Sequence, residues 1–235
     1  MVDGFVFEYI GLKSYGEVLE MQEAYFNLLL DEKSKNGKSS SPDKMFLCQH
    51  LPVYTLGKNG DESNLLPQAK QSGAEFFHTS RGGDITYHGP GQLVGYPIID
   101  LERMNIGLAK YIENIEQVII EVLNEYGITG KRLEKASGVW LDVGDPAKVR
   151  KICALGIRSS RFVTMHGFAF NINTDLSYFN HINPCGFTDK GVTSMQKELG
   201  EKQYFMHITE RVINRFKQVF DLNNTQLILP LQRND

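Results

Sequence analysis

The spacing of hydrophobic and polar positions along the chain predicts alternating blocks of strands and helices. Apolar residues recur every third or fourth position from Tyr15 to Leu29 and again over residues 107–126, which is typical of amphipathic helices. Gly127 directly follows the second stretch and is expected to end it. A third helical pattern joins Ile208 to Phe220. Short apolar runs bounded by glycine and proline predict strands; they lie at 5–12, 45–50, 53–57, 75–80, 92–101, 128–133, 138–141, 151–157 and 167–173.

The order of these elements indicates the fold class. Strand blocks and helices follow one another without the regular strand–helix–strand repeat of a parallel sheet. We therefore expect an α+β fold: a single domain over residues 1–235, with a mixed, largely antiparallel sheet flanked by helices. The polar segment DEKSKNGKSSSPD, residues 31–43, contains Gly37, four serines and Pro42. This composition predicts a flexible, solvated connector.

Composition and charge exclude several classes of protein. The chain has 235 residues, of which 41% are hydrophobic and 23% charged, which is ordinary for a globular protein. A net charge of -3 argues against a general nucleic-acid binder, which would be basic. The sequence has no basic start followed by a long apolar run, and no apolar stretch of about 18 residues that would span a membrane. We expect a cytoplasmic protein that binds neither nucleic acid nor membrane.

The three cysteines are too few and too scattered to form a disulfide framework, which favours a reducing compartment. Cys48 and Cys153 lie inside apolar strands and are expected to be small buried side chains. Neither the cysteines nor the histidines show the spacing of metal ligands, so we expect no metal site. Cys185 differs, because it lies in the turn-forming sequence NPCG, where a thiol can be accessible. A catalytic and a structural role for Cys185 are equally compatible with this position.

A nucleophilic thiol needs a neighbouring group that takes its proton or stabilises its charge. Lys151 is a candidate, because it begins the apolar strand KICALGI. If that strand is regular, Lys151 shares a face with Cys153 and Leu155, and partial burial would suit the lysine to acid–base work. The alternative is that Lys151 marks the end of a strand and extends its amine into water.

The segment RGGDITYHGPGQLVGYPI, residues 81–98, places two glycine turns around a short polar strand. One interpretation is simple reversal of the chain direction. The other is a site where the backbone must approach a ligand closely, since glycine permits such an approach. A lone RGG sequence on an acidic chain is only weak support for binding RNA.

Three blocks of sequence together resemble the lipoyl(octanoyl) transferase family, also called lipoate-protein ligase B. They are RGGDITYHGPGQLVGYPIIDL, KICALGIRSSRFVTMHGFAFNINTDLSYFNHINPCGF and GVTSMQKELG, and they occur in the order of the family between Phe46 and Gly200. The resemblance implies a fold similar to the catalytic domain of biotin and lipoate protein ligases. It also implies a catalytic pair, with Cys185 as the residue that accepts the acyl group and Lys151 as its lysine partner.

The same resemblance implies which residues line the acyl pocket. They are Arg81, Gly82, Gly83, Asp84, Ile85, Thr86, Tyr87 and His88, then Ala154, Leu155 and Gly156, and finally Gly167, Phe168 and Ala169. Glycine at four of these positions would give a thin acyl chain close backbone walls and N–H groups for its carbonyl, including those of Gly82 and Gly83. His88 would either contribute a hydrogen bond to the site or be a satisfied structural residue.

The implied activity is transfer of an octanoyl group from octanoyl-acyl carrier protein, through a Cys185 thioester, to a lysine of a lipoyl domain. This is the first step of endogenous protein lipoylation and requires no cofactor. The implied acceptors are the lipoyl domains of 2-oxoacid dehydrogenase complexes and the H protein of glycine cleavage. Acyl carrier proteins are acidic, so four basic residues near Lys151 form either a docking patch or a solvated strand edge; they are Lys148, Arg150, Arg158 and Arg161.

Two other functions fit parts of the sequence. An ATP-dependent lipoate- or biotin-protein ligase would share the fold and the glycine-rich segment, but would not use a cysteine placed like Cys185. A non-catalytic binder of acyl carrier protein would keep the pocket without needing both Lys151 and Cys185.

Overall fold

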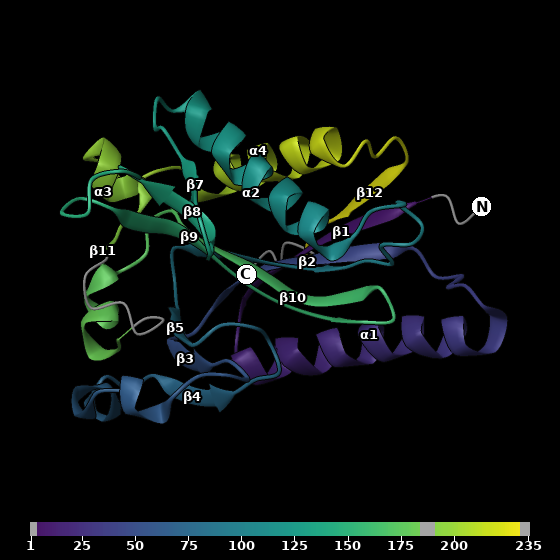
Figure 1. Cartoon of the computed structure of the whole chain (residues 1–235), viewed down its shortest axis with the longest axis horizontal. Coiled ribbons are helices and arrows are strands. Elements are labelled where there is room, and N and C mark those ends of the chain that lie inside the picture. Colours follow the sequence, from purple (N-terminus) through teal and green to yellow (C-terminus); the bar gives the residue numbers. More distant parts are fainter. Residues whose placement is uncertain (1–3, 184–190, 231–235) are drawn as a thin grey trace.

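A mixed sheet forms the middle layer of the protein (Figure 1). The structure is a computed structural model that describes residues 4–183 and 191–230. Within them the strand order is β12-β1-β2-β6-β10-β9-β8-β7, and β11 pairs with β9. β1 runs parallel to β12 and β2, and the pairs from β2 to β7 are antiparallel. The predicted mixed, largely antiparallel sheet is thus confirmed.

The strands of this sheet are β1 (Phe5–Lys13), β2 (Asp43–His50), β6 (Gln92–Ile98), β7 (Lys131–Leu133), β8 (Ala136–Leu141), β9 (Arg150–Ser160), β10 (Val163–Asn171), β11 (Gly191–Val192) and β12 (Thr225–Ile228). The helices are α1 (Tyr15–Asn36), α2 (Leu108–Glu125), α3 (Met195–Leu199) and α4 (Phe205–Val219). Short 3₁₀ turns cover Glu62–Asn64, Pro67–Gln71 and Leu176–His181. The sequence predicted the three long helices but neither α3 nor the 3₁₀ turns, which are too short to show a period.

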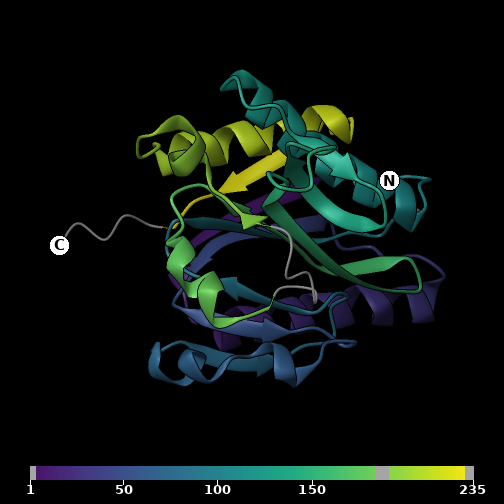
Figure 2. The same ribbon diagram turned by 60° about the vertical axis from the view of Figure 1, so that its left-hand side comes forward.

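Helices cover both faces of the sheet, and each face has its own hydrophobic core. Figures 1 and 2 show α2 and α4 on one face and α1 on the other. The larger core joins the sheet to α2 and α4 and includes Ile115, Ile119 and Phe216, each fully buried. The smaller core includes Val18 and Phe26 of α1. A protein of this size can bury two such layers without disulfides.

A second, three-stranded sheet lies beside α1, with the order β4-β3-β5 (Figure 1). It consists of β3 (Val53–Leu56), β4 (Glu75–His78) and β5 (Ile85–His88), and β3 is parallel to β4 and antiparallel to β5. The sequence predicted strands in these segments but did not separate them from the main sheet. This small sheet carries the glycine-rich segment, so its position determines where residues 81–88 lie.

The segment 31–43 is not the solvated connector that its polar composition predicted. Residues 31–36 are the last turns of α1, and Gly37 ends the helix in the left-handed conformation. Lys33 is buried and donates to Asp100 at 2.6 Å and to Glu102 at 2.7 Å. Ser39 donates to the other carboxylate oxygen of Asp100 at 2.7 Å. The prediction failed for Lys33 and Ser39 because their buried partner, Asp100, lies more than 60 residues away along the chain.

Pro97 interrupts the pairing between β6 and β10, because proline has no N–H to donate. The hydroxyl of Thr164 bridges the interruption: it donates to the Pro97 carbonyl at 2.9 Å and accepts from the Ile99 N–H at 3.1 Å. His166, which lies in the interrupted stretch, has a positive φ of 59°. Regular pairing resumes at Phe168 and Gly95. This irregular stretch forms part of the wall of the pocket described below.

No helix among residues 4–183 and 191–230 is long and apolar enough to cross a membrane.

We predict that Asp100→Asn lowers the free energy of unfolding by about 3–5 kcal/mol, the usual effect of removing one partner of a buried ion pair. The Asp100 and Lys33 side chains are only 2% and 7% exposed, so the lysine would keep a buried charge whose remaining carboxylate partner, Glu102, is 54% exposed. Urea unfolding followed by circular dichroism would measure the change. Glu113→Gln is the control, because the Lys110–Glu113 pair is exposed and its loss should cost less than about 1 kcal/mol. Equal effects of the two substitutions would contradict this interpretation of Asp100.

Candidate active site

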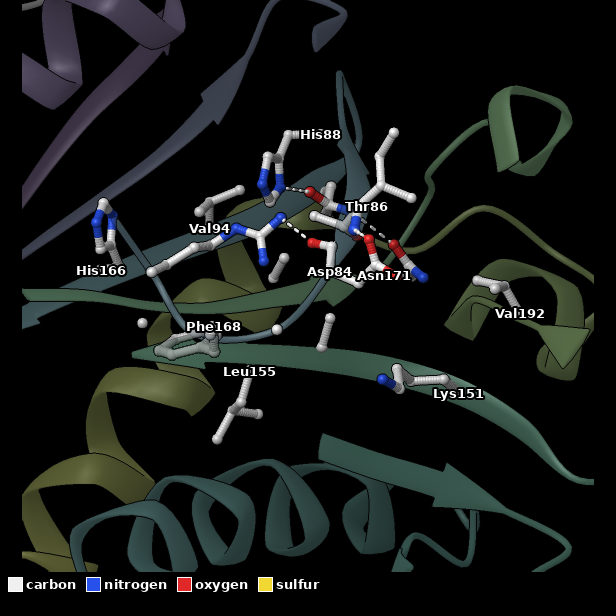
Figure 3. A pocket seen from close by; sticks show the side chains of 18 of the residues that line it. Asp84, Thr86, His88, Val94, Lys151, Leu155, His166, Phe168, Asn171 and Val192 are labelled. Carbon is white, nitrogen blue, oxygen red and sulfur yellow. Dashed lines mark hydrogen bonds between the residues drawn. The ribbon is translucent and has the colours of Figure 1, made fainter. Parts of the chain in front are cut away.

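A largely apolar pocket of about 920 Å³, including its open mouth, lies between the main sheet and the glycine-rich segment (Figure 3). Three of its walls come from the segments that the sequence singled out. The predicted residues that line it are Arg81, Gly83, Asp84, Ile85, Thr86, His88, Lys151, Ala154, Leu155, Gly156, Gly167, Phe168 and Ala169. In Figure 3, Lys151 and Val192 lie at one end of the pocket and His166 at the other.

Gly82 and Tyr87 are not among the lining residues. Side chains alternate along β5, so Thr86 and His88 face the pocket while Tyr87 turns the other way. Its ring stacks on Tyr178 with centroids 4.5 Å apart and contacts Tyr54 at 5.5 Å. Tyr87 therefore belongs to the core of the small sheet, together with the 3₁₀ turn at 176–181.

The glycines of the pocket serve a purpose that the sequence did not predict. Gly156 and Gly167 let backbone approach backbone, in addition to the close approach of an acyl chain that the resemblance implied. A Cβ on Gly156 would lie 2.9 Å from the Gly82 carbonyl oxygen, and one on Gly167 would lie 2.1 Å from that of Gly95. The Gly82 N–H already donates to the Ile157 carbonyl at 3.1 Å, so it is not the expected donor to a substrate carbonyl. The glycines are needed because strands and turn meet here without side chains between them.

Arg81 holds the glycine turn in place from inside the protein. Its guanidinium donates to the backbone carbonyls of Thr55 at 2.6 Å, Asp84 at 2.7 Å and Gly82 at 3.0 Å. It also donates to the Thr55 hydroxyl at 3.0 Å. The side chain is buried, and hydrogen bonds from a charged donor are stronger than neutral ones. Arg81 thus fastens the segment 81–84 to β3.

Lys151 lines the pocket, but it does not share a face with Cys153. The expectation assumed a regular strand, whereas the pairing of β9 with β8 shifts register between Cys153 and Lys151. Cys153 packs in the larger core, while the Lys151 amine lies 4.5 Å from the centre of the Trp140 ring, another lining residue. Gly138 permits this arrangement: its φ is +122°, and a Cβ there would lie 2.5 Å from the Cys153 carbonyl oxygen. The shift directs Lys151 into the pocket.

Cys48 and Cys153, the two cysteines within the described residues, are buried free thiols, as predicted. Burial raises the pKa of both Cys48 and Cys153, which keeps them protonated and unreactive. Cys185, the predicted acyl acceptor, lies outside the described residues. No group of three or more potential metal-binding side chains occurs among residues 4–183 and 191–230.

His88 both lines the pocket and has its hydrogen bonds satisfied. Its Nδ1 lies 2.8 Å from the Gln92 side-chain oxygen and its Nε2 lies 3.3 Å from the Thr55 hydroxyl. Burial lowers the pKa of His88 to about 3, so the ring is neutral at physiological pH. A neutral ring with both nitrogens engaged is unsuited to acid–base catalysis and suited to holding its neighbours in position.

Sequence reasoning missed several lining residues outside the three segments 81–88, 154–156 and 167–169. They are Tyr15, Gln92, Val94, Tyr96, Trp140, His166, Asn171, Phe179, Gly191 and Val192. Gln92 and Asn171 had a detectable signal, because each is a polar residue at the end of an otherwise apolar strand. The others, apart from His166, are apolar, aromatic or glycine residues that give no sequence signal.

The basic residues near Lys151 do not form a uniform free patch. Arg150 makes two hydrogen bonds to the Glu198 carboxylate, at 2.8 and 2.6 Å, and one to Asp142. Lys148 forms an exposed ion pair with Asp145 at 3.4 Å. Arg158 donates to the Ser80 hydroxyl at 3.1 Å, at the opposite end of β9. Arg150 in particular serves the local structure, since it donates to two carboxylates and to the Lys148 backbone carbonyl of the chain itself.

Comparison with known proteins identifies the family. Residues 15–217 match the model of the lipoyl protein ligase A/B catalytic domain. An octanoyltransferase of Parabacteroides distasonis is 52% identical over 93% of this chain and 100% of its own length. One from Flavobacterium psychrophilum is 50% identical over 90% of this chain and 94% of its own.

Solved structures show the same fold at low sequence identity. P. falciparum LipL1 in complex with lipoate has a TM-score of 0.72 at 14% identity, covering 98% of this chain and 67% of its own. Lipoate-protein ligase A bound with ATP has a TM-score of 0.66 at 13% identity, covering 99% and 90%. A biotin protein ligase from Aquifex aeolicus has a TM-score of 0.53 at 12% identity, covering 92% and 70%. The predicted similarity to this ligase fold is confirmed.

The chain therefore belongs to the lipoyl protein ligase A/B catalytic-domain family. Within that family its curated relatives at about half identity are octanoyltransferases, which makes it an acyltransferase of the lipoyl(octanoyl) transferase group.

We predict that Gly156→Ala lowers the free energy of unfolding by about 1–3 kcal/mol, the range found for overpacking. The new methyl group would lie 2.9 Å from the Gly82 oxygen and 3.0 Å from the Arg81 side chain, so the glycine turn would have to move. Gly4→Ala is the matched control, because nothing lies within 4 Å of its Cβ position. Urea unfolding of both variants would test this, and a neutral Gly156→Ala would show that the turn is not packed as described.

Proposed function

We propose that the protein transfers an octanoyl group from octanoyl-acyl carrier protein to a lysine of lipoyl domains, through a thioester on Cys185. The observation that carries the proposal is the position of Lys151 at one end of a largely apolar pocket. Curated relatives named octanoyltransferase, at 46–52% identity, support the choice of acyl group. On this proposal residues 1–235 act as one catalytic domain in the cytoplasm.

The first half-reaction forms the acyl-enzyme. The Lys151 amine takes the proton of the Cys185 thiol, and the thiolate attacks the octanoyl carbonyl carbon. A tetrahedral oxyanion forms and then collapses, breaking the bond to the pantetheine sulfur, which leaves with the proton from Lys151. Cys185 lies outside the described residues. The chain then reaches β9 at β11, where Gly191 pairs with Arg150 and Val192 with Lys151. Val192, which follows Cys185 by seven residues in the sequence, is thus paired with Lys151.

The oxyanion needs hydrogen-bond donors at the mouth of the pocket. Gly82 was a candidate, but its N–H is committed to Ile157. The remaining candidates are the backbone N–H groups of Gly83 and Cys185. Gly83 lines the pocket and has a positive φ of 86°, a conformation in which its N–H direction differs from that of a regular strand.

The second half-reaction releases the acyl group to the acceptor. The amine of the target lysine enters in place of pantetheine, attacks the thioester carbonyl and displaces the Cys185 sulfur, while Lys151 accepts the proton of the amine. The donor thioester is already activated and the product amide is more stable, so no ATP is consumed. The proposed acceptors are the lipoyl domains of 2-oxoacid dehydrogenase complexes and the H protein of glycine cleavage.

The walls of the pocket suit a saturated chain. Val94, Leu155 and Phe168 supply apolar surface between the Lys151 end and the His166 end (Figure 3). Each buried methylene contributes roughly 0.8 kcal/mol. The pocket therefore favours octanoyl over shorter acyl groups by a factor that grows with each pair of carbons.

Acyl carrier proteins are acidic, and of the four basic residues considered, Arg158 and Arg161 are the two that we propose for docking. Neither forms an ion pair with a carboxylate among those found in the described residues. We predict that charge reversal of both raises KM for the acyl carrier protein at low salt, since complementary charge speeds encounter. Steady-state kinetics at two ionic strengths would measure this, and an unchanged KM at low salt would exclude the patch.

We predict that the wild-type protein, mixed with octanoyl-acyl carrier protein and neither ATP nor acceptor, gains one octanoyl group on Cys185. Intact-protein mass spectrometry with peptide mapping would detect it, and hydroxylamine should remove it because it is a thioester. Cys185→Ser should accumulate no thioester. Lys151→Ala should form the adduct about 10²- to 10⁴-fold more slowly, the usual loss for a general base.

Lys148→Ala is the control, because that lysine is exposed and, within the described residues, forms an ion pair with Asp145 alone. Its rate of adduct formation should match the wild type. Absence of the adduct, together with lipoyl-domain acylation that requires ATP and free octanoate, would favour the ligase alternative. Absence of any transfer, with binding of acyl carrier protein retained, would favour the non-catalytic binder.

A further inference from the structure

A chain of buried side chains runs from Arg81 through the wall of the pocket to the strand that pairs with Lys151. Its members are Arg81, Thr55, His88, Gln92, Asn171 and Thr193, and each is less than 10% exposed. Consecutive members are joined by hydrogen bonds of 2.8–3.3 Å. Figure 3 shows His88 and Asn171 on the side of the pocket opposite Leu155.

Two backbone carbonyls determine the direction of this chain, because a carbonyl can only accept. Asn171 must turn its amide nitrogen to the Thr193 carbonyl, at 3.0 Å, which leaves its oxygen facing Gln92. Gln92 must likewise turn its nitrogen to the Tyr87 carbonyl, at 3.1 Å, and to the Asn171 oxygen, at 2.9 Å. The Gln92 side-chain oxygen can therefore only accept a hydrogen bond. The ring nitrogen of His88 that lies beside it must carry the proton.

That nitrogen is Nδ1 of His88, at 2.8 Å. A neutral ring protonated at Nδ1 has a lone pair at Nε2, which accepts from the Thr55 hydroxyl at 3.3 Å. Thr55 in turn accepts from the Arg81 guanidinium at 3.0 Å. Every donor therefore points from Arg81 towards Thr193. Reversing any member would leave a buried donor or acceptor unpaired, which costs about 1–3 kcal/mol.

Thr193 joins this chain to the backbone of Lys151. Its N–H donates to the Lys151 carbonyl at 2.9 Å, and its carbonyl accepts from Asn171. Its hydroxyl donates to Glu198, the carboxylate that binds Arg150. Thr193 is fully buried, so all three bonds are shielded from water. The backbone at Lys151 is thus held by β8 on one side and by Thr193 on the other.

We infer that Asn171 is a positioning residue for Lys151, and that His88 and Gln92 fix the orientation of Asn171. This inference rests on the proposed function of Lys151 in acyl transfer. Asn171 acts through Thr193: it sets where Thr193 lies, and Thr193 sets the backbone from which the lysine amine reaches the pocket. His88 is then an orienting group and takes no part in proton transfer.

The kinetic test compares Asn171→Ala with Asn173→Ala in single-turnover formation of the acyl-enzyme from octanoyl-acyl carrier protein. Asn173 is a matched control, because its side-chain amide also donates one hydrogen bond and accepts another. It donates to the Gln203 carbonyl and accepts from the Gln203 N–H, both at 2.8 Å. We expect the rate at saturating donor to fall about 10- to 100-fold in Asn171→Ala, the effect of a misplaced catalytic group. The half-saturating donor concentration should stay within about threefold, and Asn173→Ala should change neither quantity by more than about threefold.

Equal losses in the two variants, or a change only in the half-saturating concentration, would overturn the inference. Lys151→Ala is measured in the same experiment, so that failure of the positioning inference can be distinguished from failure of the proposed function. Lost acylation in Lys151→Ala with normal acylation in Asn171→Ala overturns the positioning role alone. Unchanged acylation in Lys151→Ala overturns both.

A second measurement needs no variant and is independent of activity. Two-bond ¹H–¹⁵N correlation spectra of the wild-type protein at neutral pH report which nitrogen of a neutral histidine carries the proton. We expect His88 to be protonated at Nδ1 and unprotonated at Nε2. Protonation at Nε2 would mean that the chain does not run from Arg81 to Thr193, and the inference would be wrong.

Discussion

Backbone-to-backbone packing at Gly156 and Gly167 is the constraint on which the pocket depends. The two glycines face each other across β9 and β10. On Gly156 lies the glycine turn at Gly82, and on Gly167 lies the carbonyl of Gly95 in β6. Because no side chain separates these segments, the turn lies directly on the sheet and the apolar pocket forms beside this contact. A methyl group on Gly156 would push the turn away from the sheet, and one on Gly167 would push β10 and β6 apart, because an interior this dense cannot absorb it.

The buried polar groups that join Arg81 to Thr193 along the pocket wall satisfy one another. The Arg81 guanidinium donates hydrogen bonds to backbone carbonyls. His88 donates to Gln92, Gln92 donates to Asn171, and Asn171 donates to the Thr193 carbonyl. A fully satisfied buried network rigidifies its surroundings, whereas an incomplete one destabilises them. The largely apolar pocket therefore lies against a rigid polar wall. Lys151 lies at one end of the pocket, and we propose that its amine transfers the proton in catalysis.

Much of the fold followed from the hydrophobic periodicity and from the glycines and prolines between elements. The three segments that line the pocket came from the resemblance to the lipoyl(octanoyl) transferase family. What the sequence could not provide were relations between distant residues. Lys33 appeared solvated because Asp100 is far away along the chain, and Lys151 appeared to share a face with Cys153 because a register shift leaves no local signal. Tyr87 was expected in the pocket with its neighbours, but strand alternation turns it into the core of the small sheet. The roles of the glycines also depend on which backbone they meet, and that is a property of the tertiary structure.

On the proposed function, the acyl group is bound covalently to the enzyme after it leaves the donor and before it reaches the acceptor. Isotope exchange tests this directly: unlabelled octanoyl-acyl carrier protein is mixed with labelled acyl carrier protein whose pantetheine arm ends in a free thiol, in the presence of enzyme and without any lipoyl domain. A covalent intermediate predicts that label appears in the octanoyl form at a rate comparable with turnover, because the first half-reaction runs in both directions. Exchange that begins only when a lipoyl domain is added would mean direct transfer between the two proteins, and would contradict the account.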